Sequence, residues 1–521
     1  MVIDDFAEAR AAPSWRTFAL AYGVLFLATQ LPLYLVAYPD INELADHIAR
    51  IHVLQHVAGD ALLQKFYVVD RGLIVPNLAM DLLAPPLAAL VGAALAVKLY
   101  ASIATLALTS GAIALGRAVA GRLSVLHLGV LMFAANSALA NGYLNYLLGL
   151  GGAFWLLAAW IRSSGPMRLT TLLGFALAAT ALYLCHLSAF GIYVLGAIGW
   201  QLRGAIGGAA ATAGRPMPSA LYAVGQFIPA ELIYVVSERP TAAASWIDPA
   251  LSGGWWSILE HKALMFITAP MAGVPANPPW IYVLPLLICA ALAGAMWRGA
   301  LRYRTAALWI AVPLALAIVL LPYSGFGSSS VDERLLPALL LIVWIGLDLA
   351  DSTEALRAIV VCLVAAATVG STTDVLIQWR ARDPEYAELR AALDELPPGA
   401  RVAAVVAGTT PGARGELSPY FGAWAIVDRG VLLSSFDVVP FHPCWVGFRQ
   451  PYVAAVRQAR TIDPRLPAPD FAALRAQFDY VIVFGGGGTA AAAYDAAAPA
   501  LYAGAHARIL ATGAAHPATV R

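Results

Sequence analysis

The chain has 521 residues, of which 60% are hydrophobic and 12% charged, with a net charge of +1 and a mean hydropathy of +0.73. Soluble globular domains carry roughly 25% charged residues, so this composition excludes an ordinary soluble enzyme. Apolar runs of about 17 to 21 residues recur, the length that crosses a hydrocarbon core of roughly 30 Å. No basic stretch interleaved with aromatic residues stands out, which excludes nucleic acid as a partner. The sequence predicts a polytopic α-helical membrane protein.

About eleven apolar runs are predicted to span the membrane. The first follows a charged start and ends without a small-residue cleavage site, so we expect a retained helix rather than a signal peptide. An additional half-span fits near residues 78–95. The predicted spans are residues 17–37, 97–117, 122–139, 143–161, 170–185, 187–203, 218–236, 280–297, 304–322, 334–350 and 355–375.

Arginine positions indicate how these spans are oriented. With the N-terminus in the cytoplasm, the short inner loops carry arginine, whereas the turns near 139–142, 185–187 and 323–333 contain neither lysine nor arginine. This distribution follows the positive-inside rule. The richness in alanine and the use of arginine in place of lysine indicate a GC-rich bacterial genome, so we expect the bacterial inner membrane, with the outer face in the periplasm.

The residues from 376 onward are expected to form a periplasmic α/β domain. Glu385–Leu396 reads as an amphipathic helix and Arg401–Val406 as a strand, and Phe471–Phe478 leads into a second strand at Tyr480–Phe484. The predicted organisation is a transmembrane domain at 1–375, with long outer loops at 38–96 and 237–279, followed by the α/β domain at 376–521.

The first outer loop carries the densest group of ionisable residues. If residues 42–57 are helical, Glu43, Asp46, His47 and Arg50 recur at i, i+3, i+4 and i+7 and share one face. An interfacial helix whose charged stripe is solvated, with Asp46–Arg50 and Glu43–His47 pairs, explains this pattern equally well.

Asp40 differs from that stripe because Pro39 precedes it at the exit of the first span. A carboxylate there can face a cavity between the membrane domain and the loop. Such a group is a candidate general base.

The chain resembles the GT-C superfamily of membrane glycosyltransferases. The resemblance lies in a first helix ending in Tyr38-Pro39-Asp40 with Glu43 nearby, a long first outer loop, about eleven spans and an outer C-terminal α/β domain. It implies a sugar donor linked to polyprenyl phosphate and an acidic first-loop residue as the catalytic base. By position Asp40 matches that acid, and Asp46 is the alternative.

Transfer from a lipid phosphate also requires a cation, because charge builds on the departing phosphate. Lys262 follows Trp255-Trp256 in the second outer loop, and a lysine that snorkels at a helix end is the other interpretation. Arg334 could clamp phosphate or pair locally with Asp332 or Glu333. The full set of predicted substrate-binding residues is Glu43, His47, Arg50, Glu231, Arg239, His261, Lys262 and Arg334.

Among these, Glu231 is notable because a carboxylate inside an apolar segment is costly unless it is paired or faces a wet cavity. A divalent cation is conceivable at Asp40, Glu43, Asp46 and His47, although their spacing matches no metal motif, so no metal site is assigned.

The sequence therefore favours a glycosyltransferase, hexosyl or pentosyl, that acts on a glycan, lipid or protein acceptor at the periplasmic face. A transporter or flippase for a lipid-linked or polysaccharide substrate is the alternative. No inverted repeat with paired broken helices supports that alternative.

Overall fold

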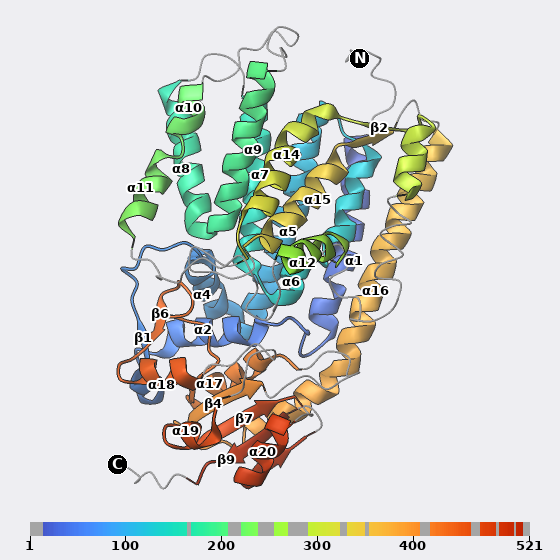
Figure 1. Ribbon diagram of the computed structural model, residues 1–521. Coiled ribbons are helices and arrows are strands. Elements are labelled where there is room, and N and C mark those ends of the chain that lie inside the picture. Colours follow the sequence, from blue (N-terminus) through green and yellow to red (C-terminus); the bar gives the residue numbers. More distant parts are fainter. Residues whose placement is uncertain are drawn as a thin grey trace.

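The structure is a computed structural model that places helices at one end, a β-sheet at the other and the first loop between them (Figure 1). It describes residues 14–163, 168–206, 220–237, 255–268, 290–323, 331–349, 354–406, 417–459, 469–485, 489–504 and 507–513.

Four of the described helices are long and apolar enough to cross a membrane: α1 (Trp15–Leu35), α5 (Ala93–Ala120), α7 (Leu144–Arg162) and α16 (Glu354–Leu393). The polytopic helical architecture predicted from the sequence is confirmed, whereas the number of eleven spans stays a prediction. Other helices of this part are α4 (Ala79–Val91), α8 (Leu169–Cys185), α9 (Leu187–Ile206), α12 (Trp255–Thr268), α14 (Leu308–Leu320) and α15 (Leu336–Ile345).

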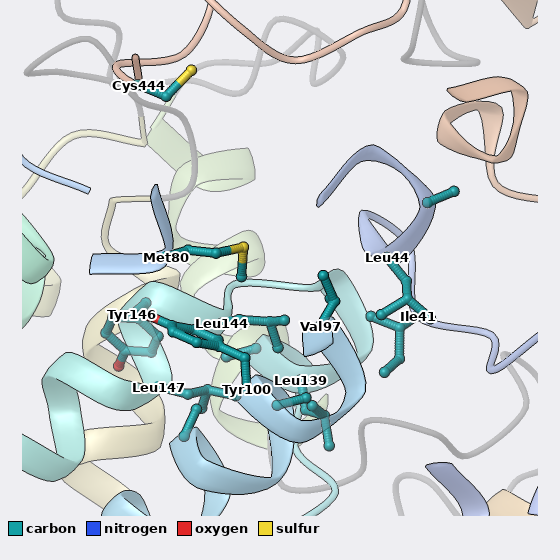
Figure 2. Packing of buried hydrophobic residues seen from close by; sticks show 14 of the residues in the cluster. Ile41, Leu44, Met80, Val97, Tyr100, Leu139, Leu144, Tyr146, Leu147 and Cys444 are labelled. Atoms are coloured by element: carbon teal, nitrogen blue, oxygen red, sulfur yellow. The ribbon is translucent and has the colours of Figure 1, made fainter. Parts of the chain in front are cut away.

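Helices α5 and α7 cross closely because small residues line their contact. A Cβ added at Gly151 would lie 2.2 Å from the backbone of Ala107, and one at Gly111 would lie 2.4 Å from the Gly151 oxygen. Such contacts are typical of helix pairs in membranes. Figure 2 shows Val97 and Tyr100 of α5 beside Leu144 and Leu147 of α7, and all four are buried.

Two predicted spans are divided into shorter pieces. Residues 122–139 form the 3-10 helix η1 (Val125–Phe133) and the short α6 (Ser137–Asn141), because Ser124 and Asn136 accept backbone N–H groups and start a new element each time. Residues 218–236 form α10 (Ala220–Gly225) and α11 (Ile228–Val236), with Pro229 in the first turn of α11.

The predicted half-span near 78–95 corresponds to the short apolar helix α4, whereas the tenth span is corrected. Gly92, with a φ of 81°, separates α4 from α5, since glycine adopts positive φ without strain. Residues 334–350 contain η4 (Glu333–Leu335), α15 and the short strand β3 (Leu347–Leu349), which pairs antiparallel with β2 (Leu301–Tyr303).

Helix α16 joins the two ends of the molecule. It runs for 40 residues along one side, from the helical end down to the sheet (Figure 1). The sequence predicted a break near residue 376 and a separate helix from Glu385, yet α16 continues through Pro384. A proline removes one helical hydrogen bond, and here it does not end the helix.

The C-terminal part contains a five-stranded sheet in the order β5-β4-β7-β9-β8. The predicted strands β4 (Arg401–Val406) and β7 (Tyr480–Phe484) are confirmed, and they pair in parallel at its centre. The other strands are β5 (Leu432–Leu433), β8 (Ala500–Ala503) and β9 (Ala507–Ala511). The helices of this part are α17 (Trp424–Arg429), α18 (Tyr452–Ala459), α19 (Phe471–Arg475), α20 (Thr489–Ala497) and the 3-10 helix η5 (Pro419–Ala423).

The first loop is tied to this C-terminal part. It contains α2 (Leu44–His56), α3 (Ala61–Phe66) and β1 (Tyr67–Val69), and β1 pairs antiparallel with β6 (Val446–Phe448). The Tyr67 hydroxyl donates to the Val431 carbonyl at 2.8 Å. The candidate residues of the first loop therefore lie between the helices and the sheet.

Candidate functional site

Asp40 lies at the exit of α1 and is held by two side chains of α16. The Arg382 guanidinium donates to Oδ2 at 2.5 Å, and the Tyr386 hydroxyl donates to Oδ1 at 2.6 Å. The side chains of Asp40 and Arg382 remain 23% and 17% exposed. The carboxylate is thus fixed in direction and still open to solvent.

Side chains from α16 and α5 hold the backbone that precedes Asp40. Asp383 of α16 accepts the N–H groups of Ala37 and Tyr38 at 3.2 and 2.7 Å. Lys98 of α5 donates to the carbonyls of Val36 and Ala37 at 3.0 and 3.3 Å. The chain therefore leaves α1 in one defined direction.

A cavity of about 380 Å³ opens beside this corner. Its wall combines apolar and aromatic side chains with the Lys98 ammonium, and Pro39 and Ile41, the neighbours of Asp40, belong to it. The lining residues are Tyr34, Ala37, Tyr38, Pro39, Ile41, Asn42, Leu44, Ala45, Ile48, Ala94, Leu95, Lys98, Tyr386, Ser418, Phe421 and Trp424. Such a wall suits a ligand with both an apolar and an anionic part.

The charged face of α2 is buried rather than solvated, which corrects the interfacial interpretation. Arg50 Nε lies 3.0 Å from Asp81 Oδ1 of α4, and neither side chain is more than 2% exposed. Asp81 also accepts the Trp445 N–H at 2.9 Å, and Asp46 accepts the Asp437 N–H at 3.1 Å. The predicted binding residue Arg50 and the alternative base Asp46 are therefore placed in contacts between the first loop, α4 and the C-terminal part.

Glu43 and His47 meet the turn before α7. His47 Nε2 donates to the Gly142 carbonyl at 2.7 Å and lies 3.8 Å from Glu43 Oε2, the pair anticipated from the i, i+4 spacing. Gly142 has a φ of 86°, and a Cβ there would lie 2.8 Å from Glu43 Cβ, so only glycine fits. Burial, and then the nearby Arg50 charge, lower the pKa of His47 to about 3. His47 is therefore uncharged at neutral pH.

A buried hydrogen-bond network continues from α5 into the C-terminal part. Asn145 Oδ1 accepts from the Met80 N–H at 3.0 Å and from the Tyr100 hydroxyl at 2.5 Å. Its amide nitrogen therefore donates to Asn77, at 2.7 Å from both the carbonyl and Oδ1. Asn77 has a φ of 79°, the one positive φ outside glycine among the described residues.

The same network fixes the proton on His442. Because Asn77 Oδ1 accepts from Asn145, the Asn77 amide nitrogen faces His442 Nε2 and donates to it. The His442 proton then lies on Nδ1, which is 3.2 Å from Asp437 Oδ2. We call the chain Tyr100–Asn145–Asn77–His442–Asp437 the polar network.

Arg334 lies against Tyr143, the residue that precedes α7. Its guanidinium carbon is 4.6 Å from the centre of the Tyr143 ring, and its backbone carbonyl accepts from the Tyr146 hydroxyl. Its Nε is buried and has no hydrogen-bond partner in the described part of the chain. The structure shows no ion pair between Arg334 and either of the described residues Asp332 and Glu333.

Lys262 is engaged by protein groups. Its ammonium donates to the carbonyls of Ile318 and Leu321 at 2.8 and 3.0 Å and pairs with Asp332. An ammonium has three N–H groups, so these contacts use all of them, and Lys262 clamps α12 to the end of α14.

The remaining predicted residues lie elsewhere. Glu231 is exposed in the first turn of α11. Arg239 lies outside the described residues, and of His261 only its place in α12 is described. Among the residues that the structure describes, no three His, Cys, Asp or Glu side chains gather in a way that could hold a metal ion.

Sequence reasoning did not identify Arg382, Tyr386 and Asn77 as site residues. Arg382 and Tyr386 lie more than 340 positions from Asp40, so no local spacing connects them. An unbroken α16 would have been the signal, because it puts residues 382, 383 and 386 on one face. Pro384 concealed that continuity.

No family model and no curated protein matches the chain. Among solved structures it is similar to ArnT from Cupriavidus metallidurans bound to undecaprenyl phosphate, with a TM-score of 0.50 and 13% identity over 97% of this chain and 99% of ArnT. It is also similar to the arabinofuranosyltransferase AftD from Mycobacteria, with a TM-score of 0.46 and 16% identity over 97% of this chain and 40% of AftD. The chain has the GT-C fold that its sequence features resemble.

Proposed function

We propose that this chain is a membrane glycosyltransferase that moves a hexose or pentose from a polyprenyl-phosphate-linked donor to a glycan, lipid or protein acceptor. The observation that carries the proposal is the cavity of about 380 Å³ beside Asp40, lined by apolar and aromatic groups and by Lys98. The fold likeness to ArnT, which binds undecaprenyl phosphate, extends over nearly the whole of both chains and supports the same class of donor.

Asp40 is the proposed general base. Its carboxylate takes the proton of the acceptor hydroxyl while the acceptor oxygen bonds to the anomeric carbon of the sugar. The bond between that carbon and the phosphate oxygen breaks, and its electron pair leaves with the polyprenyl phosphate. Asp46 is a weaker candidate because it is buried and holds the Asp437 N–H.

Lys98 and Arg334 are the proposed cations for the phosphate. Lys98 uses two N–H groups on the carbonyls of Val36 and Ala37, which leaves one for a ligand. Arg334 is the second candidate, because its Nε has no partner in the described part of the chain, and this buried atom would have to become exposed to meet a phosphate. A cation in this place stabilises the charge that builds on the departing oxygen.

We further propose that the first loop and the C-terminal part face the periplasm of a bacterial inner membrane, with the N-terminus in the cytoplasm. The arginine distribution supports this orientation, because the turns near 139–142 and 185–187 carry no basic residue. The cavity would then open at the outer leaflet, where the lipid-linked donor is delivered.

The test uses purified full-length protein in nanodiscs, undecaprenyl-phosphate-linked hexoses and pentoses that each carry a radiolabelled sugar, and a panel of glycan, lipid and protein acceptors. We expect time-dependent loss of the label from the lipid and release of undecaprenyl phosphate. Asp40→Asn should lower this rate about 10²- to 10⁴-fold, the usual contribution of a general base. Asp70→Asn is the matched control, because Asp70 is an exposed carboxylate of the same loop.

Binding of undecaprenyl phosphate itself is measured in parallel for both variants, and we expect wild-type affinity. An Asp40→Asn variant that turns over at the wild-type rate contradicts the role of Asp40. Movement of intact donor across a vesicle membrane, with no cleavage of the sugar, would instead support a transporter.

A further inference from the structure

Three residues of helix α16 make four hydrogen bonds with the segment that follows α1. Arg382 and Tyr386 each bind one oxygen of Asp40, and Asp383 binds the N–H groups of Ala37 and Tyr38. These three α16 residues lie within five positions of each other, on one helix face. The direction of the Asp40 carboxylate is therefore set from α16.

The hydrogen bonds from Arg382 and Tyr386 leave Asp40 able to accept a proton. A carboxylate has about four lone-pair sites, two on each oxygen. Arg382 occupies one site on Oδ2 and Tyr386 one site on Oδ1, so each oxygen keeps a free site. Tyr386 is the donor to Asp40, because an ionised carboxylate only accepts hydrogen bonds, and its hydroxyl oxygen in turn accepts the Ser418 N–H at 3.4 Å.

The same helix region also reaches the cavity wall and the C-terminal part. Tyr386 lines the cavity, and Arg390, one turn further on, stacks on Trp424 at 3.6 Å from the ring centre. Trp424 also lines the cavity. Arg390 is in addition paired with Asp428 at 2.7 Å. One rigid element thus holds the carboxylate and supports the wall against which a substrate would lie.

We propose that Arg382 and Tyr386 are positioning residues for Asp40, and that α16 thereby links the C-terminal part to the reacting carboxylate. The inference rests on the proposed function. Arg382 supplies a fixed planar donor to Oδ2, and Tyr386 fixes the second oxygen. Neither residue needs to touch the substrate for this role.

The test is a double-mutant cycle on kcat and KM with the undecaprenyl-phosphate-linked sugar that wild-type protein turns over. Arg382→Gln should lower kcat about 10²-fold with KM nearly unchanged, since a small misplacement of a reacting group costs about that much. In the Asp40→Asn background, Arg382→Gln should cause no further loss, because it acts only through Asp40.

Two further variants separate positioning from folding. Arg382→Lys keeps the charge and loses the planar fork, so its kcat should lie between those of the wild type and Arg382→Gln. Tyr386→Phe keeps the ring in the cavity wall and removes the donor, so kcat should fall about 10-fold. Arg380→Gln, which changes an exposed arginine of the same helix, should leave kcat unchanged.

The inference is overturned if Arg382→Gln lowers kcat by the same factor in the wild-type and Asp40→Asn backgrounds. It is also overturned if Arg382→Gln raises KM and leaves kcat unchanged. If Arg382→Gln protein is not folded, Tyr386→Phe carries the same cycle. Wild-type protein that releases no undecaprenyl phosphate would refute the proposed function itself, which distinguishes that failure from a failure of the positioning role.

Discussion

The two ends of the 40–50 segment meet the rest of the molecule in contrasting ways. Asp40 pairs with Arg382 beside a cavity, and both side chains keep about a fifth of their surface exposed. Arg50 pairs with Asp81 where both are almost fully enclosed. An enclosed ion pair is too well surrounded to exchange a proton with a substrate, whereas an open pair can do so. The open pair at Asp40 is therefore suited to proton transfer, and the enclosed pair at Arg50 to stabilising the fold.

The largest effect should come from breaking the enclosed pair. Arg50→Met leaves the Asp81 carboxylate buried without its cation, which typically costs about 3–5 kcal/mol. SDS titration in mixed micelles measures the free energy of unfolding. The double variant Arg50→Met, Asp81→Leu should recover part of the loss, because no charge then remains buried.

The control for that measurement is Arg457→Met, which changes an exposed arginine of α18 and should shift the free energy of unfolding by less than about 0.5 kcal/mol. An Arg50→Met variant as stable as this control would remove the contrast between the two ends.

The next largest effect is expected from the polar network. Asn145→Leu leaves the Met80 N–H and the Tyr100 hydroxyl without their acceptor, and buried groups of this kind cost roughly 1–3 kcal/mol each. We expect a total of about 3 kcal/mol in the same titration. Tyr100→Phe removes a single hydroxyl and should cost about 1 kcal/mol. A loss from Tyr100→Phe equal to that from Asn145→Leu would contradict the network.

His47 should make stability depend on pH. Burial and Arg50 lower its pKa to about 3 in the folded protein, whereas an unfolded histidine titrates near 6.5. Between these values the unfolded chain binds the extra proton, so the free energy of unfolding falls as the pH drops from about 6.5 toward 3. One histidine contributes at most about 1.4 kcal/mol per pH unit.

His47→Gln is the variant for this prediction, because its amide can still donate to the Gly142 carbonyl. The two proteins should be similar at pH 7.5, and at pH 5 the variant should have gained about 2 kcal/mol relative to the wild type. An equal loss of stability on acidification in both proteins would assign the pH dependence to other groups.

Much of the fold could be predicted from local sequence. Apolar runs of membrane length predicted α1, α5 and α7, and short continuous apolar runs predicted β4 and β7. These signals are local, since burial in lipid or in a sheet selects each residue type directly. The division of 122–139 and the continuity of α16 were not predicted, because caps and prolines act through contacts that a hydropathy pattern does not contain.

Of the candidate site, only the first-loop residues could be predicted from the sequence. The density of charge in the first loop identified the face of α2, and the position after Pro39 identified Asp40. The partners Arg382, Asp81 and Asp437 come from other segments of the chain. A charged helix face is interpreted as exposed to solvent unless the residue that pairs with it is known. The charged residues of α2 could therefore be predicted, whereas their burial could not.

The smallest expected effect on stability comes from the Asp40 end. Asp40→Asn replaces a carboxylate in a partly exposed pair, and such pairs contribute about 0–1 kcal/mol because water solvates the partner that remains. We expect the free energy of unfolding, measured by SDS titration, to change by less than about 1 kcal/mol, while turnover falls by orders of magnitude. A residue whose loss removes activity but hardly changes stability is held in place for chemistry.

This outcome is informative only beside the Arg50→Met result. If Asp40→Asn lowers the free energy of unfolding by 3 kcal/mol or more, Asp40 is a structural joint between α1 and α16, and a loss of turnover would then follow from loss of the fold. If it costs less than about 1 kcal/mol, the contacts from Arg382 and Tyr386 are not needed to keep the corner folded. Their remaining effect is to direct the carboxylate, which is why the same two contacts can matter greatly to a rate and little to stability.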